Sequence, residues 1–413
     1  MSCAQPRPVS TRMRIAHFCI GRCNPESANG VDKTVYYLSR AQAALGHDVA
    51  VFSLTDKPAL PIPGVNVRAY APMRAPAALA HGRLGELLIT RSPLNLPRPL
   101  VAELLAWQPD ILHLHFVHLP QNIALARQVE RRGIPYCVTI NGGLSRSALS
   151  RRRLQKRLFG ALIEHRYLKR AAFLHAISAE DTDGLGAYGA AAERVVVAPN
   201  GIDLEDLPKP GDPHGLRDQF PALGDKQLLL FVGRLDPEQK GLDLAIRAFA
   251  AARPENVMLV LVGPDWRGGR ARLEALTRDL GVSEQVLFTG PAFGQQKADL
   301  LHAAAAFVHL SRWEAGIPFS VLEAAAMGRP CLLTTAADPA RQLAAVGGAI
   351  VVEVDEGEIA EGMRRLFSLS ERERTSMGEA AQELVAQEFS WTPIAKRLVQ
   401  EYQQHAVRPS MVH

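Results

Sequence analysis

The sequence is poor in cysteine: it has five in 413 residues, and no two of them form a CxxC pair. Such an odd, scattered set disfavours both a disulfide framework and a cysteine-based zinc site. It indicates a reducing compartment, where thiols stay free.

Long apolar runs are also missing. No segment approaches the ~18 consecutive apolar residues that a membrane-spanning helix needs. Residues 1–12 are polar, contain two prolines and have no apolar core, so they do not have the pattern of a signal peptide. We therefore expect a cytoplasmic protein whose fold begins at Met13, with peripheral attachment to the inner face of the cytoplasmic membrane as a further hypothesis.

Internal repeats, low-complexity stretches and nucleic-acid-binding signatures are absent as well, and the net charge is only +5. We expect no nucleic-acid partner. The charge fits an arginine-rich composition, or attraction to anionic substrates or an anionic membrane surface. A hydrophobic content of 47% with 22% charged residues is typical of a soluble globular protein. The chain is longer than one hydrophobic core usually allows, which favours two domains.

The first half opens with a βαβ pattern. Residues 14–20 predict a strand, Gly30 begins a helical pattern, and residues 47–52 predict the next strand. The loop between the first strand and the helix should lie at the carboxyl edge of a parallel sheet, where ligands bind in such folds. It lacks the GxGxxG pattern with a following acidic residue, which argues against an NAD-dependent oxidoreductase.

Polar residues follow two further predicted strands, 110–115 and 136–140. His115 ends the first, and Asn141 and Gly142 follow the second. We predict that all three contact hydroxyl groups of an acceptor sugar, although a hydrogen-bonded structural histidine explains His115 equally well. Asparagine can bind a hydroxyl group but cannot titrate. Between 55 and 100 we expect loops and short helices.

Residues 151–170 form a basic helical pattern with a leucine stripe. A surface helix packed on its own domain is one interpretation. The alternative is a helix that faces anionic lipid or attracts a polyprenyl diphosphate.

The second half has a basic loop after a predicted buried strand, 228–232. The loop, GRLDPEQKG, contains Gly233, Arg234 and Lys240. Both cations can reach one anion from the end of this strand. Arginine offers a planar fork of donors and lysine a compact charge, which together suit a diphosphate. The remaining pattern predicts helices at 272–280, 300–306 and 393–404, and strands at 173–177, 195–198, 258–262, 286–288 and 307–310.

The segment 311–334, SRWEAGIPFSVLEAAAMGRPCLLT, predicts a loop, a short helix and a strand. Pro318 fits the first helical position, and Gly328 fits the residue after the helix end. Glu314 and Glu323 bracket the junction of loop and helix. A helix N-terminus favours an anion, and flanking carboxylates can hold hydroxyl groups, so this segment suits a sugar joined to a phosphate.

SRWEAGIP followed by VLEAAAMGRP, together with GRLDPEQKG, NG…LGHDVAVF and PNGID, resembles the motifs of retaining glycosyltransferases of family 4 (glycosyl transferases group 1), which have the GT-B fold. The resemblance covers roughly residues 13–405. It implies an α/β protein with two Rossmann-like domains facing across a cleft, and a C-terminal helix that crosses back to the N-terminal domain. The implied domains are 13–203, completed by 391–405, for the acceptor, and 204–390 for the nucleotide-sugar.

The resemblance also implies transfer of a sugar to a glycan or a polyprenyl-diphosphate-linked acceptor, in bacterial surface polysaccharide or lipopolysaccharide assembly. No cofactor and no metal are expected, because the two basic residues can replace Mg²⁺. Arg234, Lys240 and Glu314 are the candidate catalytic residues. The candidate donor-binding residues are Gly30, Gly233, Arg234, Lys240, Gly290, Glu314, Gly316, Ile317, Pro318 and Glu323.

One departure from the family pattern concerns the two glutamates, which the family usually separates by seven residues and this chain by eight. If the loop absorbs the extra residue, Glu314 keeps the sugar-binding place. If it does not, Ala315 takes that place. Two other functions stay open: a nucleotide-sugar epimerase of the same architecture, and a catalytically inactive sugar-binding or membrane-scaffold protein.

Overall fold

The computed structural model describes residues 12–26, 29–72, 96–144, 164–182, 185, 192–209, 211, 213–338 and 341–405. The chain divides into two compact units. The first comprises Met1–Pro199 together with Trp391–His413, and the second comprises Asn200–Ser390. This division lies near the boundaries expected from the sequence.

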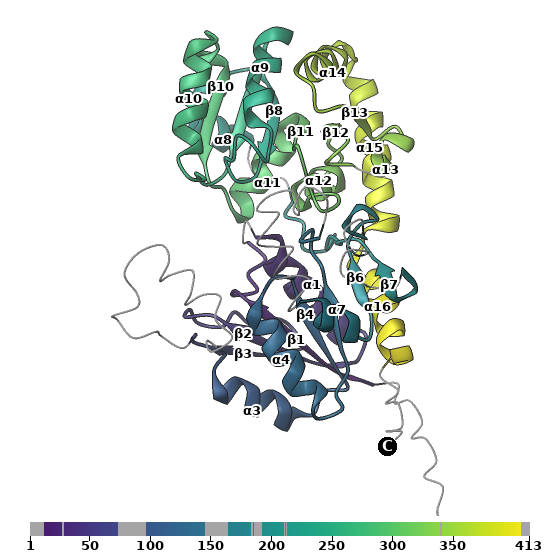
Figure 1. The fold of residues 1–413 in the computed structure, drawn as a ribbon. Coiled ribbons are helices and arrows are strands. Elements are labelled where there is room, and N and C mark those ends of the chain that lie inside the picture. The colour runs from purple at the N-terminus through teal and green to yellow at the C-terminus, as the bar shows by residue number, and fades with distance from the viewer. Residues whose placement is uncertain are drawn as a thin grey trace, which may run out of the picture. The chain divides into compact units, whose positions relative to one another are not determined.

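The N-terminal unit is built on a seven-stranded sheet with the order β3-β2-β1-β4-β5-β6-β7, in which every pairing is parallel (Figure 1). This is the strand order of a Rossmann fold with one strand added. The strands are β1 (Arg14–Ile20), β2 (Asp48–Leu54), β3 (Val65–Tyr70), β4 (Ile111–His115), β5 (Tyr136–Thr139), β6 (Leu174–Ala176) and β7 (Val195–Val197). The helices are α1 (Gly30–Ala44), α3 (Arg98–Trp107), α4 (Pro120–Glu130) and α7 (His165–Arg170), joined by α16 (Trp391–His405).

The C-terminal unit repeats this plan with a six-stranded parallel sheet of order β10-β9-β8-β11-β12-β13. Its strands are β8 (Gln227–Val232), β9 (Val257–Val262), β10 (Val286–Gly290), β11 (Ala304–His309), β12 (Cys331–Thr334) and β13 (Ala349–Val352). Its helices are α8 (Pro213–Gln219), α9 (Leu242–Ala252), α10 (Gly269–Asp279), α11 (Gly294–Ala303), α12 (Phe319–Ala326), α13 (Gln342–Ala345), α14 (Glu356–Ser368) and α15 (Glu371–Glu388). The expected pair of Rossmann-like domains is confirmed.

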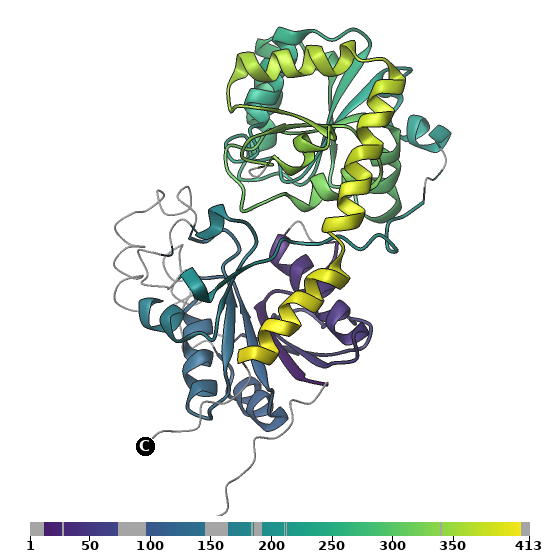
Figure 2. The ribbon, with the colours of Figure 1, turned by 90° about the vertical axis from the view of Figure 1, so that its right-hand side faces the viewer.

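Helix α16 closes the N-terminal unit, although it follows the C-terminal unit in sequence (Figure 2). Its buried residues, Trp391, Ile394, Leu398, Val399 and Tyr402, recur at helical spacing. The Trp391 ring stacks on Tyr37 of α1, and the Tyr402 hydroxyl accepts a hydrogen bond from Gln42 Nε2 at 3.1 Å. The C-terminal helix therefore completes the core of the domain in which the chain begins.

Several sequence-based boundaries differ from the structure. Strand β3 lies where only loops and short helices were expected. Helix α11 ends at Ala303, and the next residues, expected to be helical, begin β11. Alanine favours helices, but Ala304 and Ala306 are buried in the sheet, so packing overrides propensity there. Of the basic 151–170 segment, residues 151–163 lie outside the described residues, and His165–Arg170 forms α7.

Candidate functional site

Two loops meet at the centre of the C-terminal sheet. β8 and β11 are paired neighbours, and the strand order reverses between them, so the loops that follow them flank the switch point where such sheets bind ligands. Gly241 shows how closely the loops pack. It has φ +61°, and a Cβ atom there would lie 1.9 Å from the carbonyl oxygen of Leu310. Only glycine permits this approach.

Lys240 and Glu314, one from each loop, form an ion pair between Nζ and Oε1. Their side chains are only 12% and 11% exposed. Ser311 Oγ donates a hydrogen bond to the same carboxylate oxygen at 2.6 Å, and His309 Nε2 lies 3.2 Å from it. The two sequence motifs, 74 residues apart, thus converge on one buried polar cluster.

Electrostatics keep this cluster charged. Burial by itself would raise the pKa of Glu314, but the charge of Lys240 and the hydrogen bond from His309 outweigh burial and lower that pKa to about 2. Burial lowers the pKa of His309 from its usual value. His309 is therefore a neutral imidazole at neutral pH, and it donates its Nε2 proton to the carboxylate.

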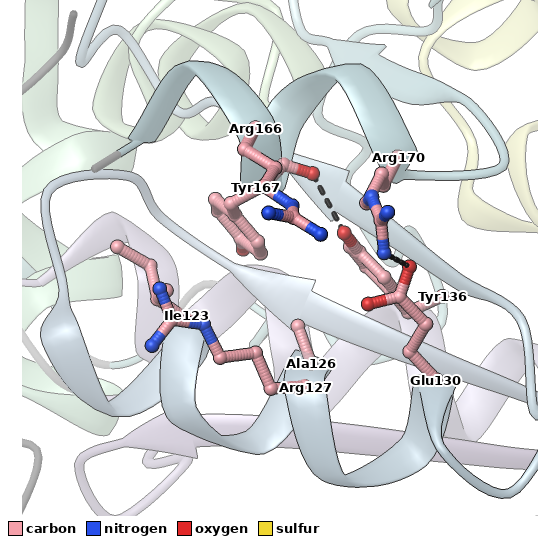
Figure 3. Close-up of a pocket in the computed structure, with 8 residues that line it drawn as sticks. All are labelled: Ile123, Ala126, Arg127, Glu130, Tyr136, Arg166, Tyr167 and Arg170. Atoms are coloured by element: carbon pink, nitrogen blue, oxygen red, sulfur yellow. Dashed lines mark hydrogen bonds and ion pairs between the residues drawn. The ribbon is translucent and has the colours of Figure 1, made fainter. Parts of the chain in front are cut away.

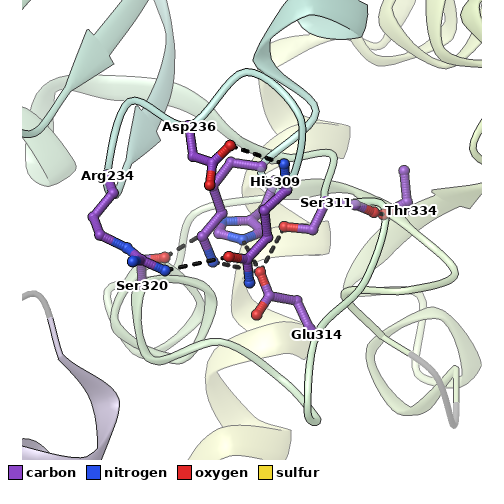
Figure 4. Close-up of polar contacts among 9 residues, drawn as sticks. Arg234, Asp236, His309, Ser311, Glu314, Ser320 and Thr334 are labelled. Atoms are coloured by element: carbon purple, nitrogen blue, oxygen red, sulfur yellow. Dashed lines mark hydrogen bonds and ion pairs between the residues drawn. The ribbon is translucent and has the colours of Figure 1, made fainter. Parts of the chain in front are cut away.

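Arg234 lies beside this cluster (Figure 4). Its guanidinium sits 4.3 Å from the centre of the Trp266 ring, and one nitrogen donates to Gln239 Oε1 at 3.3 Å. No acidic residue pairs with it within the described part of the chain. Stacking holds the guanidinium in place without neutralising it, which leaves donors for an anion.

Arg312 fastens the two loops together, a role that the sequence reasoning missed. Both of its terminal nitrogens donate to the Asp243 carboxylate at 2.8 Å, and one also donates to the carbonyl of Glu238 at 2.9 Å. Its backbone N–H donates to the Gln239 carbonyl at 3.0 Å. Arg312 directly follows Ser311 in the SRWEAGIP motif. This position is the signal in the sequence that could have identified it.

The start of α12 differs by one residue from the expectation. Pro318 is the residue before the helix, with φ −63° and ψ 145°, and Phe319 is the first helical residue. No side chain caps this helix end. Gly316 has φ +134°, which lets the loop turn into the helix, and Ile317 packs partly buried on the domain core. Leu322 and its buried neighbours pack the helix on the domain core.

Glu323 lies one turn into α12 and pairs with Lys297 of α11 at 3.2 Å. Both side chains are about 15% exposed. Gly290 ends β10 with φ +79°, and Gly233 follows β8. These residues all belong to the carboxyl edge of the C-terminal sheet. Gly30 belongs to the other unit, where it begins α1 directly after the capping residue Asn29.

The three candidate acceptor residues lie at strand ends of the N-terminal sheet. His115 is 1% exposed, and its Nε2 lies 3.0 Å from Nδ1 of His17. Asn141 and Gly142 follow β5 with φ +50° and +76°. Asn141 Nδ2 is buried and has no hydrogen-bond partner among the described residues. Nearby Asp181 is fully buried, and burial raises its pKa to about 7.

His115 belongs to a buried histidine network that the sequence reasoning did not foresee. Ligand atoms of His17, His113 and His115 lie within 4.8 Å of one another, as in some metal sites. However, the His113 and His115 rings stack at 4.3 Å, and both nitrogens of His113 already bond, to Tyr402 OH at 2.7 Å and Thr139 Oγ1 at 2.5 Å. Stacked rings cannot direct nitrogens at one ion, so the geometry fits a hydrogen-bond network. His175 extends it through Thr139 Oγ1 at 2.9 Å.

Comparison with known proteins agrees with this architecture. Residues 29–201 match the model of the glycosyl transferase 4-like domain, and residues 226–368 match that of glycosyl transferases group 1. A D-inositol 3-phosphate glycosyltransferase from Frankia alni is 30% identical over 93% of this chain and 96% of its own. The chain belongs to glycosyltransferase family 4. An enzyme of the same name from Catenulispora acidiphila is 29% identical, over 91% of this chain and 90% of its own.

Solved structures show the same GT-B fold as this glycosyltransferase. Sucrose-phosphate synthase from Thermosynechococcus elongatus aligns with a TM-score of 0.71 at 20% identity, over 95% of this chain and 99% of its own. Anabaena Alr3699/HepE, in complex with UDP and glucose, aligns with a TM-score of 0.72 at 19% identity, over 94% and 99%. In the described part of the glycosyltransferase, no helix is both long and apolar enough to cross a membrane.

Proposed function

We propose that this glycosyltransferase moves a sugar, with retention of anomeric configuration, from a nucleotide-sugar to a glycan or lipid-linked acceptor. The observation that carries the proposal is the convergence of Lys240, Arg234 and Glu314 at the switch point of the C-terminal sheet. The two cations and the N-terminus of the helix favour a diphosphate. The two carboxylates beside them can hold hydroxyl groups of the attached sugar and ribose. The Anabaena structure in complex with UDP and glucose supports this choice of donor.

The chemistry follows from where charge develops. Cleavage of the bond between sugar and diphosphate builds positive charge on the anomeric carbon and negative charge on the leaving diphosphate. Arg234, Lys240 and the start of α12 would stabilise the leaving group, because preorganised donors are most effective where charge develops. Glu323 would bind ribose hydroxyls, and Glu314 a sugar hydroxyl.

The Lys240–Glu314 pair adds a step to donor binding. Lys240 cannot bind a diphosphate fully while it neutralises Glu314. We infer that the diphosphate competes for Lys240 and frees the carboxylate to accept a hydrogen bond from the sugar. Beside Lys240, the carboxyl group has a pKa of about 2 and is ionised. It is an acceptor rather than an acid, which fits a binding role and not proton donation to the leaving group.

The acceptor would bind at the strand ends of the N-terminal unit. Asn141 supports this, because it offers a buried amide donor that no described residue occupies. The function we favour is bacterial surface polysaccharide or lipopolysaccharide assembly, at the inner face of the cytoplasmic membrane. A solved structural neighbour, WaaG, is described as involved in lipopolysaccharide biosynthesis. The names of the curated relatives favour a second acceptor, D-inositol 3-phosphate.

Turnover should not require a divalent metal, because Arg234 and Lys240 are placed to neutralise the leaving diphosphate. We expect unchanged donor turnover in excess EDTA, measured as release of nucleoside diphosphate. Loss of activity that Mg²⁺ or Mn²⁺ restores would contradict this prediction and would show that a metal site had been overlooked.

The two glutamates should separate into different roles. Glu323→Gln should weaken binding of the free nucleoside diphosphate strongly, since its proposed partner is the ribose. Glu314→Gln should leave that binding unchanged or tighten it by up to about tenfold, because Lys240 loses a competing partner worth on the order of 1 kcal/mol. Its turnover should nevertheless fall, because the proposed contact to the sugar is lost.

Calorimetric titration and steady-state kinetics on both variants test this separation. Weaker nucleotide binding in Glu314→Gln would show that Glu314 mainly orients Lys240. Turnover equal to that of the wild type would remove Glu314 from the sugar site altogether.

The general proposal is tested by release of nucleoside diphosphate from a panel of sugar donors, with cell-envelope lipid extract or D-inositol 3-phosphate as acceptor. A transferase should show release that depends on one acceptor. Conversion of the donor into an epimeric nucleotide-sugar, without net release of nucleotide and without any dependence on an acceptor, would favour an epimerase. Donor binding with neither release nor epimerisation would favour the inactive sugar-binding alternative.

A further inference from the structure

A small pocket lies between α4 and α7 of the N-terminal unit (Figure 3). It is shallow and partly open to solvent. Tyr136, which helps to line it, is the first residue of β5, and Glu130 is the last residue of α4. Both therefore lie toward the amino ends of the strands, away from the proposed acceptor site. The pocket is lined by Ile123, Ala126, Arg127, Glu130, Tyr136, Arg166, Tyr167 and Arg170.

The charges that line the pocket are unbalanced. Three arginines face one carboxylate, and Arg170 pairs with Glu130 at 2.5 Å. Arg127 and Arg166 are exposed, and neither guanidinium group has a hydrogen-bond or ion-pair partner within the described ranges. Two guanidinium groups, one from each helix, are thus available to a single anion at the pocket.

Helix capping explains only one of these cations. Arg127 lies in the last turn of α4, where the helix dipole favours a positive charge. Arg166 belongs to α7 and is not in its last turn, so the same explanation does not apply to it. It lies beside two further arginines at the pocket.

Two tyrosines form an uncharged wall of the pocket. The rings of Tyr136 and Tyr167 stack at 5.6 Å, and the Tyr136 hydroxyl donates to the Tyr167 carbonyl at 2.6 Å (Figure 3). Burial raises the pKa of Tyr136 further above its usual value, so this hydroxyl stays neutral. The wall supplies no negative charge to offset Arg127 and Arg166.

We propose that this pocket binds a phosphoryl group through Arg127 and Arg166. Arginine forks bind phosphate in bidentate fashion, and the stacked tyrosines can contact an adjoining carbon. The pocket is small and partly open to solvent, so the site suits one phosphate and its nearest substituent, not a whole nucleotide-sugar. The phosphate can belong to a phospholipid head group or to a soluble phosphate ester. The proposal does not depend on the proposed transfer reaction.

The first test measures binding of the full-length protein to phosphatidylglycerol vesicles at low salt. Arg127→Gln with Arg166→Gln should weaken binding by about 30-fold, which corresponds to about 1 kcal/mol for each arginine near an anionic surface. Arg272→Gln with Arg278→Gln, two exposed arginines of α10, is the charge-matched control and should bind like the wild type. Both double variants should keep a Tm close to that of the wild type, because none of these side chains has a hydrogen-bond or ion-pair partner among the described residues.

The second test separates the sources of the phosphate and its chemistry. Glycerol 3-phosphate is titrated by calorimetry into the same proteins, and vesicles with an equal charge of oleate carboxylate replace the phospholipid. Binding that depends on Arg127 and Arg166 in either phosphate assay supports the pocket and identifies the lipid or the soluble source. The proposal is overturned if the pocket and control variants lose binding equally, if neither phosphate probe depends on the two arginines, or if oleate vesicles bind as tightly as phospholipid.

Discussion

Replacing Lys240 or Arg234 with alanine should lower turnover by about 10²–10³-fold. Both cations are placed to meet the negative charge that develops on the leaving diphosphate. Removal of one such preorganised group typically costs about 2.7–4 kcal/mol of transition-state stabilisation. The loss should appear in kcat as well as in kcat/KM, since the charge is greater in the transition state than in the bound donor.

Each substitution needs its own control. Lys240→Ala leaves the nearly buried Glu314 carboxylate without its partner, which by itself can destabilise the domain. The double variant Lys240→Ala/Glu314→Gln removes that charge and should be equally inactive but better folded. Arg247→Ala, on the exposed side of α9, is the matched control for Arg234→Ala and should keep wild-type activity. Wild-type turnover in folded Arg234→Ala or Lys240→Ala would remove that residue from the site.

The N-terminal unit should lose stability steeply as pH falls below about 6.5, because four buried histidines must take up protons. Burial lowers the pKa of His17 and of His175 from 6.5 to about 4. It lowers the pKa of His113 and of His115 as well, and neighbouring imidazoles contribute. The unfolded chain therefore binds more protons than the folded one between pH 6.5 and 4, so the free energy of unfolding decreases as pH falls.

The size of this effect follows from the shifts. At pH 5, His17 and His175 each contribute a loss of about 2 kcal/mol relative to neutral pH. Asp181 acts in the opposite direction, because its raised pKa of about 7 lets the folded state bind a proton first. That gain is about 2 kcal/mol at pH 5 relative to neutral pH. His113 and His115 add to the loss, so the net change is destabilising.

Calorimetric unfolding at pH 7.5, 6 and 5 measures the effect. The transition of the C-terminal unit is identified as the one whose Tm rises when a nucleoside diphosphate is added. His175→Gln, which cannot take up a proton, should flatten the pH dependence of the N-terminal transition. His302→Gln lies in the other unit and should leave that transition unchanged. A pH dependence that is the same in His175→Gln and in the wild type would contradict the account.

Much of the C-terminal site was accessible to sequence reasoning because it is local. GRLDPEQKG and SRWEAGIP each follow a short, largely apolar strand, and parallel strands place both loops at one edge. The sequence therefore predicts that Arg234, Lys240 and Glu314 belong to one region. It could not predict that Lys240 pairs with Glu314. The two residues are 74 positions apart, and their contact depends on side-chain conformations that the sequence does not show.

Other features depend on packing that the sequence does not display. His113 and His115 are two residues apart in a strand, so a shared face was predictable. Their stacking on His17 depends on the strand order of the sheet. The link to Tyr402 depends on the packing of α16 against the N-terminal unit. The start of α12 was missed by one residue because proline fits both the position before a helix and its first turn.

The most direct test of the central claim is calorimetric titration of UDP, GDP and ADP into the wild-type protein and into Arg234→Ala/Lys240→Ala. The account predicts saturable binding of at least one of these nucleotides with one site per chain. It predicts weaker binding in the double variant and in high salt, because the proposed contacts are ionic. Absence of binding for all three nucleotides, or equal affinity in the wild type and the double variant, would contradict the assignment of this loop pair as the diphosphate site.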